Sequence, residues 1–284
     1  MERTTVSIWQ AILLGLTQGA SEYAPISSSG HLILVPWMLD IPIVRDAELN
    51  KTFDVALHMG TLLGAVVYFR HDLARYLVAG WRSLRTRRIE TTDERLAWAL
   101  AVGTIPAVLV GAALEEVIQE NLSQPWLIAV MFVAFGVVLW LVDRVMRRDR
   151  AFETIGVRTG LYLGIAQSLA LQPGVSRSGV TMTAARLIGL DREASARFSF
   201  LLSIPVVLGA GLYKSIDLVQ GGFHGYEVEF FWGFVASAVS GFVVIAFLLR
   251  YLKGHSFVIF LWYRLAVAAL TFALIATGVR SATI

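Results

Sequence analysis

The chain has 284 residues, of which 56% are hydrophobic and only 16% are charged, and its mean hydropathy is +0.66. Soluble domains carry about 25% charged residues, so this composition excludes an ordinary soluble domain and indicates lipid as the main solvent. Cysteine is absent, which excludes disulfide bonds and thiolate metal sites. The formal net charge is only +3, so no nucleic-acid partner is expected, and the placement of the charges matters more than their sum.

The first apolar region, residues 7–39, is interrupted by polar residues. Ser7–Ala20 is followed by the polar stretch Ser21–His31 and then by a brief apolar run, Leu32–Leu39. A helix that crosses the roughly 30 Å hydrocarbon core needs about 20 apolar residues, so each run spans only part of it. We predict a re-entrant helix hairpin whose polar tip lies at membrane depth, packed in protein or beside a wet cavity. One long, kinked helix is the alternative.

Three longer apolar segments follow, and each approaches the length of a full membrane span. They are Phe53–Phe69, Leu96–Leu114 and Pro125–Val142. The interrupted pattern then returns as an apolar run, a polar stretch and a second apolar run, at Gly156–Leu171, Gln172–Ser178 and Gly179–Leu190. We predict a second re-entrant hairpin there. Three further spans are predicted at Phe198–Tyr213, Phe230–Leu249 and Ser256–Gly278.

Lys and Arg residues are strongly segregated on this map. Seventeen of the 24 lie on one side, in the segments that follow the first, third and fifth spans and the second hairpin. The other side holds five: Arg3, Arg45, Lys51, Lys214 and Arg280. Because positive charge accumulates in cytoplasmic loops, we assign the side with 17 charges to the cytoplasm. Both termini and the first hairpin then face outward, and the second hairpin enters from inside.

The two halves of this single membrane domain, approximately residues 1–150 and 151–284, resemble each other. A shift of 149 positions pairs identical residues in the two broken regions: Gly15 with Gly164, Gln18 with Gln167, Ser27 with Ser176, Ser29 with Ser178 and Gly30 with Gly179. Since the halves start from opposite sides, we predict an inverted-topology repeat whose broken helices meet near the midplane. The predicted fold is an all-α integral membrane protein with six transmembrane helices and two re-entrant helix hairpins.

The first polar tip combines residues that are suited to metal binding and proton transfer. Gln18 and Glu22 are four positions apart and share one helix face. Glu22 is suited to bind a hard divalent cation through oxygen, with Gln18 as a neutral neighbour. His31 is suited to proton transfer near neutral pH. Ser28 or a neighbouring serine is a candidate nucleophile if a base lies within reach.

The second tip adds Arg177, whose planar fork can hold two phosphate oxygens. If both tips open new half-helices, their serine-rich N-termini provide backbone N–H groups and positive dipole ends that suit phosphate. Structural explanations also exist: serines cap helices, Glu22 can pair with Arg177 alone, and a lone histidine is usually a hydrogen-bonded core residue. A charge at membrane depth costs about 2.5–3.5 kcal/mol on insertion scales, so the combination favours a functional site.

Three other polar residues lie inside predicted spans. Asp54 and His58 share one face of the first span near its outer end, and we expect them to stand behind the site rather than to touch substrate. Arg264 lies eight residues into the last span. We expect Arg264 to anchor the helix bundle or to reach a backbone carbonyl.

At these residues the sequence resembles the bacterial undecaprenyl-diphosphate phosphatase family, also known for bacitracin resistance. The resemblance rests on Q-x-x-x-E at Gln18 and Glu22, S-S-S-G-H ending at His31, and P-G-V-S-R-S-G-V-T from Pro173 to Thr181. It covers nearly the whole chain. It implies removal of one phosphate from undecaprenyl diphosphate at an outward-facing site in the bacterial plasma membrane, which recycles the lipid carrier for cell-wall synthesis. It further implies dependence on a divalent cation, Mg²⁺ or Ca²⁺, and a homodimer.

Mapped by motif, Gln18 and Glu22 would bind the metal, His31 would transfer a proton, and Arg177 would clamp the diphosphate. The phosphate pocket would be lined by the hydroxyl side chains of both tips: Ser27, Ser28, Ser29, Ser176, Ser178 and Thr181. Many members of the family carry glutamate where this chain has Gln18, so this chain offers one carboxylate rather than two. Ser28, His31 and an activated water all stay open as the group that attacks phosphorus.

Two other functions compete with this one. A second membrane lipid-phosphatase family uses K-x6-R-P, P-S-G-H and S-R-x5-H-x3-D signatures, but Thr183 stands here where that family has its second histidine. The non-enzyme alternative is a lipid-phosphate flippase or small-anion transporter, because inverted repeats and broken helices are typical of transporters. Release of phosphate from a lipid diphosphate by the purified protein discriminates between enzyme and transporter.

Overall fold

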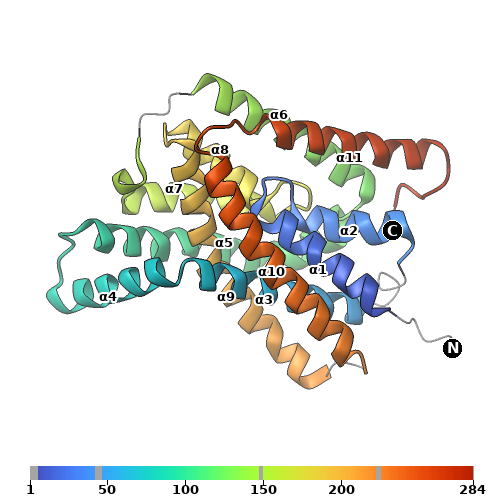
Figure 1. The fold of residues 1–284 in the computed structure, drawn as a ribbon, viewed down its shortest axis with the longest axis horizontal. Helices are drawn as coiled ribbons and strands as arrows, with labels where there is room; N and C mark the ends of the chain where they lie inside the picture. Colours follow the sequence, from blue (N-terminus) through green and yellow to red (C-terminus); the bar gives the residue numbers. More distant parts are fainter. Residues whose placement is uncertain (1–5, 42–46, 147–149, 222–224, 284) are drawn as a thin grey trace.

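The computed structural model describes residues 6–41, 47–146, 150–221 and 225–283, and its regular elements are helices throughout these ranges (Figure 1). The α-helices are α1 (Ile8–Tyr23), α2 (Ser28–Leu39), α3 (Ala47–Tyr68), α4 (Arg70–Thr86), α5 (Thr92–Leu122), α6 (Pro125–Val145), α7 (Val157–Ser168), α8 (Arg177–Leu187), α9 (Arg192–Gly221), α10 (Glu227–Tyr251) and α11 (Val258–Ala276). Two short 3-10 helices, η2 (Phe152–Thr154) and η3 (Leu169–Leu171), flank α7. The all-α prediction is confirmed.

Five helices are long and apolar enough to cross a membrane. These candidate spans are Thr92–Leu114, Pro125–Val145, Arg192–Tyr213, Glu227–Tyr251 and Val258–Ala276. The sixth candidate is a bent pair, in which Leu49–Tyr68 and α4 meet at 80°. The predicted first span is therefore half of a broken element. The helix breaks at Phe69, where the sequence changes from an apolar run to the charged residues that begin at Arg70.

Each interrupted region folds as two short helices that double back. Helix α2 returns beside α1, so that Val6, just before α1, packs in one apolar cluster with Ile41, just after α2 (Figure 1). Helix α8 likewise lies beside α7, and Arg150 exchanges backbone hydrogen bonds with Gly189 and Asp191. Neither region is one long, kinked helix.

The first break is shorter than predicted, because much of the polar stretch 21–31 is helical. Helix α1 continues through Glu22 to Tyr23, and only residues 24–27 separate it from α2. Pro25 explains the stop: the residue before a proline is pushed into extended backbone, and Ala24 has φ −65° and ψ 140°. The second break leaves residues 172–176 outside helices.

Glycines allow the broken helices to lie close to long ones. A Cβ atom at Gly15 would clash with the Gly233 carbonyl oxygen on α10, and one at Gly164 would clash with the Gly103 carbonyl oxygen on α5. In membrane proteins, small residues at helix contacts let backbones approach closely. Gly15 and Gly164, which the predicted repeat pairs, thus each make a close contact with a long helix.

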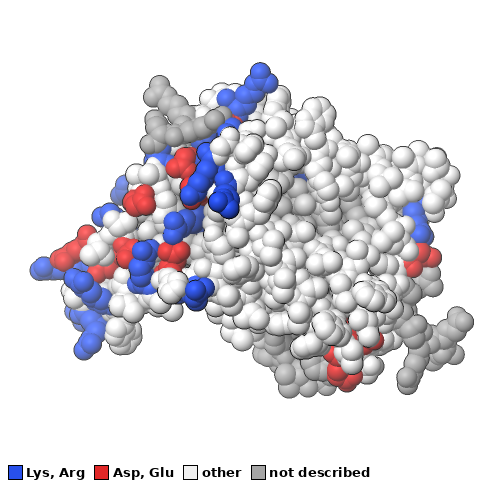
Figure 2. Space-filling model, viewed as in Figure 1, with Lys and Arg blue, Asp and Glu red and all other residues white. Residues whose placement is uncertain are grey.

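Charged side chains gather at the end of the molecule that carries α4, while the centre of the face in view is almost free of them (Figure 2). The spatial arrangement thus follows the segregation of Lys and Arg along the chain. Four of the arginines counted for the topology, Arg3, Arg45, Arg147 and Arg148, lie outside the described residues, as does the side chain of Lys214.

Candidate active site

The turns of the two broken regions touch each other. Ser178 Oγ donates to the Ala24 carbonyl oxygen at 2.9 Å, and the Gly174 N–H donates to Ser27 Oγ at 3.1 Å. These contacts join residues that are 154 and 147 positions apart in the chain. The second turn therefore lies directly against the first.

The two turns also share an unusual backbone geometry. Ser27 has φ 75° and ψ 97°, and Ser176 has φ 76° and ψ 114°. Each is the N-cap of its half-helix, with Oγ accepting from the N–H of Gly30 or Gly179. Positive φ is uncommon for a residue other than glycine, and such strained backbone clusters at functional sites. Both halves of the chain thus carry the same strained N-cap at their tips.

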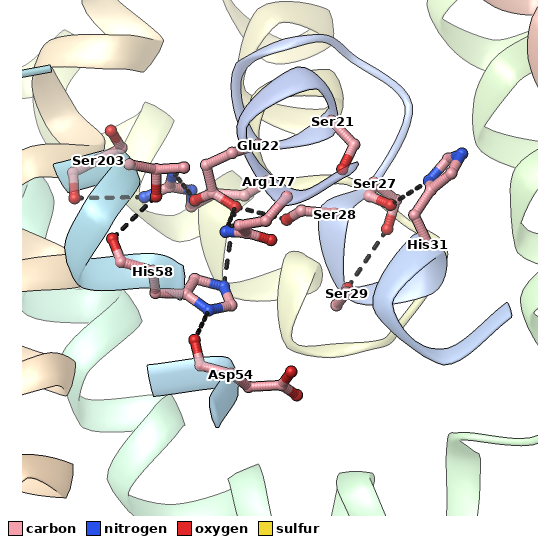
Figure 3. Close-up of polar contacts among 12 residues, drawn as sticks. Ser21, Glu22, Ser27, Ser28, Ser29, His31, Asp54, His58, Arg177 and Ser203 are labelled. Atoms are coloured by element: carbon pink, nitrogen blue, oxygen red, sulfur yellow. Dashed lines mark hydrogen bonds and ion pairs between the residues drawn. The ribbon is translucent and has the colours of Figure 1, made fainter. Parts of the chain in front are cut away.

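Glu22 is the centre of the polar cluster (Figure 3). Its Oε2 accepts from Gln18 Nε2 at 3.0 Å and from Ser28 Oγ at 2.5 Å, and its Oε1 accepts from Arg177 Nη2 at 2.6 Å. Ser28 is the first residue of α2 and Arg177 is the first residue of α8. Two half-helix N-termini therefore converge on one buried carboxylate, as expected of a place that stabilises negative charge.

His58 on α3 completes this cluster. Its Nε2 lies 3.7 Å from Glu22 Oε2, and its Nδ1 lies 2.8 Å from the Asp54 carbonyl oxygen (Figure 3). A carbonyl oxygen only accepts, so Nδ1 carries a proton and Nε2 is the nitrogen that faces the carboxylate. From the sequence, His58 is expected behind the site rather than in contact with substrate. The structure places its side chain against Glu22. The sequence feature that points to His58 is its position one helical turn from Asp54 in an otherwise apolar span.

His31 lies apart from this cluster, with its ring turned away from Glu22 (Figure 3). Its Nδ1 is 2.7 Å from the Ser27 carbonyl oxygen, and its Nε2 is 2.8 Å from Tyr263 Oη. The ring also lies near-parallel to the rings of Phe132 and Tyr263. Both ring nitrogens are thus engaged in hydrogen bonds within the protein, and the role of His31 in proton transfer stays a prediction.

Most of the predicted phosphate-binding hydroxyls hold the turns together. Ser27 Oγ lies 3.3 Å from Ser29 Oγ, Ser176 Oγ lies 3.1 Å from Ser178 Oγ, and Thr181 Oγ1 donates to the Arg177 carbonyl oxygen at 2.8 Å. Four of them are buried, namely Ser27, Ser176, Ser178 and Thr181. Ser28 and Ser29 are the two that are partly exposed.

One buried oxygen of the cluster is open to a divalent cation. Gln18 Oε1 is buried and has no hydrogen-bond partner among the described residues, while Gln18 Nε2 is 3.0 Å from Glu22 Oε2. Within the described ranges, no group of three His, Asp or Glu side chains is placed to hold a metal. Mg²⁺ is often bound by one or two carboxylates together with substrate phosphates. Gln18 Oε1 is therefore the oxygen that is open to a cation, and Glu22 beside it together with the substrate would supply further ligands.

Comparison with known proteins gives the family. The family model described as bacitracin resistance protein BacA matches residues 11–270. The chain belongs to this family. The match includes both turns and all the residues of the polar cluster, and the resemblance deduced from the motifs is confirmed. As a BacA family member with five to six candidate spans, the chain is a multi-pass membrane protein.

Curated BacA-type relatives match over nearly their whole length. The undecaprenyl-diphosphatase of Gemmatimonas aurantiaca is 42% identical over 272 residues, which are 96% of this chain and 99% of the relative. The undecaprenyl-diphosphatase of Pelobacter propionicus is also 42% identical, over 276 residues and the same shares. That of Geobacter sulfurreducens is 43% identical over 274 residues, which are 94% of this chain and 100% of the relative.

Proposed function

We propose that the chain is an undecaprenyl-diphosphatase, which hydrolyses undecaprenyl diphosphate to the monophosphate and inorganic phosphate and so returns the lipid carrier to cell-wall synthesis. Full-length relatives of that name support this function. The observation that carries it is the convergence of Ser28 and Arg177, from two half-helix N-termini, on Glu22. This arrangement unites a hydroxyl nucleophile, a carboxylate base and a phosphate-binding guanidinium.

Ser28 and Glu22 supply the nucleophile and the base. Ser28 Oγ attacks the terminal phosphorus while its proton passes to Glu22 across the 2.5 Å contact. The bond from this phosphorus to the bridging oxygen breaks, and undecaprenyl phosphate leaves with that oxygen and takes up the proton from Glu22. Water then attacks the phosphoserine, and Glu22 moves one of its protons to the Ser28 oxygen as inorganic phosphate leaves.

Arg177 positions the diphosphate and neutralises its charge. Phosphoryl transfer depends on positioning and electrostatic stabilisation more than on covalent chemistry. The Arg177 guanidinium bridges Glu22 and the Ser203 carbonyl oxygen, with Nη1 3.2 Å from the latter, and its side chain is 16% exposed. It is thus held from two helices while one edge stays open to a ligand. The backbone N–H groups at the starts of α2 and α8 add to the stabilisation of the phosphates.

We further propose that a divalent cation, Mg²⁺ or Ca²⁺, assists this reaction. Gln18 Oε1 and Glu22 would hold the ion, and its charge would offset that of the diphosphate oxygens. The release of phosphate should then stop in EDTA and return when Mg²⁺ or Ca²⁺ is added. Full activity in chelator would remove the cation from this proposal.

The proposed membrane arrangement is an inverted repeat of two halves whose broken helices are re-entrant hairpins. The matched N-caps Ser27 and Ser176, and the matched glycines Gly15 and Gly164, support the repeat. The active site opens outward in this arrangement, because the charged end that carries α4 is assigned to the cytoplasm. A homodimer is also proposed, and light scattering of the purified protein in detergent tests it.

Phosphate release tests the central proposal. Protein purified in detergent should release inorganic phosphate from undecaprenyl diphosphate, and Ser28→Ala should abolish the release, with Thr277→Ser, near the end of α11, as a control. A brief, quenched reaction should contain phosphate covalently bound to Ser28. A protein that binds the lipid but releases no phosphate would instead act as a flippase or transporter.

A further inference from the structure

Arg264 on α11 is a buried arginine that holds both turns. It is 1% exposed, and its Nε donates to the Pro25 carbonyl oxygen in the first turn at 2.8 Å. Its Nη2 donates to the Val175 carbonyl oxygen at 3.1 Å, and its Nη1 lies 3.5 Å from that of Gly174, both in the second turn. One guanidinium therefore joins the two turns from a third element, 239 and 89 positions away from the carbonyls it binds.

The neighbouring helices leave room for this side chain. A Cβ at Gly179 on α8 would lie 3.0 Å from Arg264 Nη2, and one at Gly136 on α6 would lie 3.1 Å from Arg264 Cδ. The guanidinium carbon also lies 5.8 Å from the centre of the Phe132 ring. Two glycines and an aromatic ring thus enclose the guanidinium. One of them, Gly179, lies only two residues beyond Arg177.

The charge of Arg264 has no carboxylate partner in the described part of the chain. Arg177 pairs with Glu22, and Arg186 and Arg192 pair with Asp143, whereas the hydrogen bonds described above for Arg264 all go to carbonyl oxygens. A buried charge is costly when it is not paired, and at membrane depth such a residue is a functional hypothesis by default. An anion bound in front of the turns would lower that cost.

We propose that Arg264 is a positioning residue that clasps the two turns, and that its positive charge is balanced by the phosphates of the bound substrate. Three hydrogen bonds set the distance between Ser28 and Arg177, which follow the two turns directly. The charge adds to the field of the two half-helix N-termini, so it strengthens binding of a diphosphate anion. The part that concerns substrate rests on the proposed function, while the clasp does not.

The test separates geometry from charge. Arg264→Lys keeps the charge, but an ammonium cannot bridge the carbonyls of two turns in the way a planar fork does. We expect turnover of undecaprenyl diphosphate to fall at least about 10-fold, the low end for hydrogen bonds to a charged group, with near-normal binding of methylenediphosphonate, a non-hydrolysable probe. Arg264→Gln removes the charge, so it should weaken probe binding at least about 10-fold as well.

The matched control is Arg280, which also donates to a main-chain carbonyl, that of Met38, but already faces Asp40. Arg280→Lys and Arg280→Gln should leave turnover and probe binding unchanged. Equal loss of probe affinity in both Arg264 variants would overturn the role of the charge. Wild-type turnover in folded Arg264→Lys would overturn the clasp.

A gentler variant covers the case in which Arg264 variants do not fold. Gly136→Ala places a methyl group against Arg264 Cδ and Leu261 Cδ1, so it should shift the arginine side chain slightly and lower turnover while the protein remains folded. Wild-type turnover in folded Gly136→Ala would count against the clasp. If the wild-type protein hydrolysed nothing, the proposed function would fail, yet probe binding would still report on Arg264.

Discussion

At the scale of single residues, the position of Glu22 explains most of the chemistry. Three donors, from Gln18, Ser28 and Arg177, hold a carboxylate that α3 approaches through His58. Hydrogen bonds that involve a charged group are roughly twice as strong as neutral ones, so the cluster is rigid before the substrate arrives. Substitutions here test distinct parts of the proposed reaction.

Arg177→Lys should lose most of its activity although the charge is kept. The guanidinium reaches Glu22 on α1 and Ser203 on α9 at once, which a single ammonium cannot reproduce. We expect turnover to fall by about 10²-fold, the low end for loss of one preorganised donor to a developing negative charge. Arg197→Lys, on α9 beside Asp72, is the control and should turn over normally. Near-normal rates in folded Arg177→Lys would refute this phosphate clamp.

Gln18→Glu and Glu22→Gln should have opposite effects. Gln18→Glu places two carboxylates side by side. We therefore expect activity at saturating Mg²⁺ to be retained and the cation to bind more tightly than in the wild type. The second removes the base and leaves two neutral amides, so activity should fall by at least about 10²-fold. Titration of Mg²⁺ against initial rate measures both variants. An identical cation dependence in Gln18→Glu and wild type would argue that Gln18 does not meet the ion.

Tyr263→Phe distinguishes two roles of His31. If His31 transfers protons, the loss of the Tyr263 hydroxyl frees Nε2 and should leave turnover high, whereas His31→Ala should lower it by at least about 10²-fold. If His31 only positions the turn, both variants should lose activity together with thermal stability. The predicted role of His31 in proton transfer requires the first outcome, although both ring nitrogens have partners in this structure. Activity and melting temperature of the two variants decide the matter.

At the scale of helices, glycine contacts decide how closely the broken helices approach the long ones. Gly164→Ala should destabilise the protein, because the new methyl group would clash with the Gly103 backbone on α5. Overpacking typically costs about 1–3 kcal/mol, so thermal unfolding in detergent should begin at a lower temperature. Gly209→Ala on α9 is the matched control, since no atom lies within 4 Å of its added Cβ. Equal melting temperatures would contradict this account of helix packing.

At the scale of the whole molecule, the absence of cysteine makes the topology directly testable. In the proposed topology Ser123, at the end of α5, lies outside and Thr86, at the end of α4, lies inside. Ser123→Cys should react with an impermeant thiol reagent in intact cells, and Thr86→Cys should react only after lysis. Ser28→Cys should react slowly from outside and be protected by substrate. Labelling of Thr86→Cys in sealed cells would invert the topology and move the chemistry to the cytoplasmic face.

The sequence by itself determined the membrane character, the two broken regions and the residues of both tips. These features depend on local composition, on the length of apolar runs and on Pro and Gly beside serines, and all of them can be counted along the chain. The family could also be recognised from the sequence, because its motifs lie within short segments around Gln18 and Arg177.

Only the tertiary structure decided which polar residues meet. Arg177 reaches Glu22 across 155 positions, and His58 reaches it from another helix, while His31, nine residues from Glu22, turns away to Tyr263, 232 positions along the chain. Arg264 clasps both turns in the same long-range way. Sequence spacing says which residues share a helix face, but contacts between helices depend on packing angles and on the small residues that permit close approach.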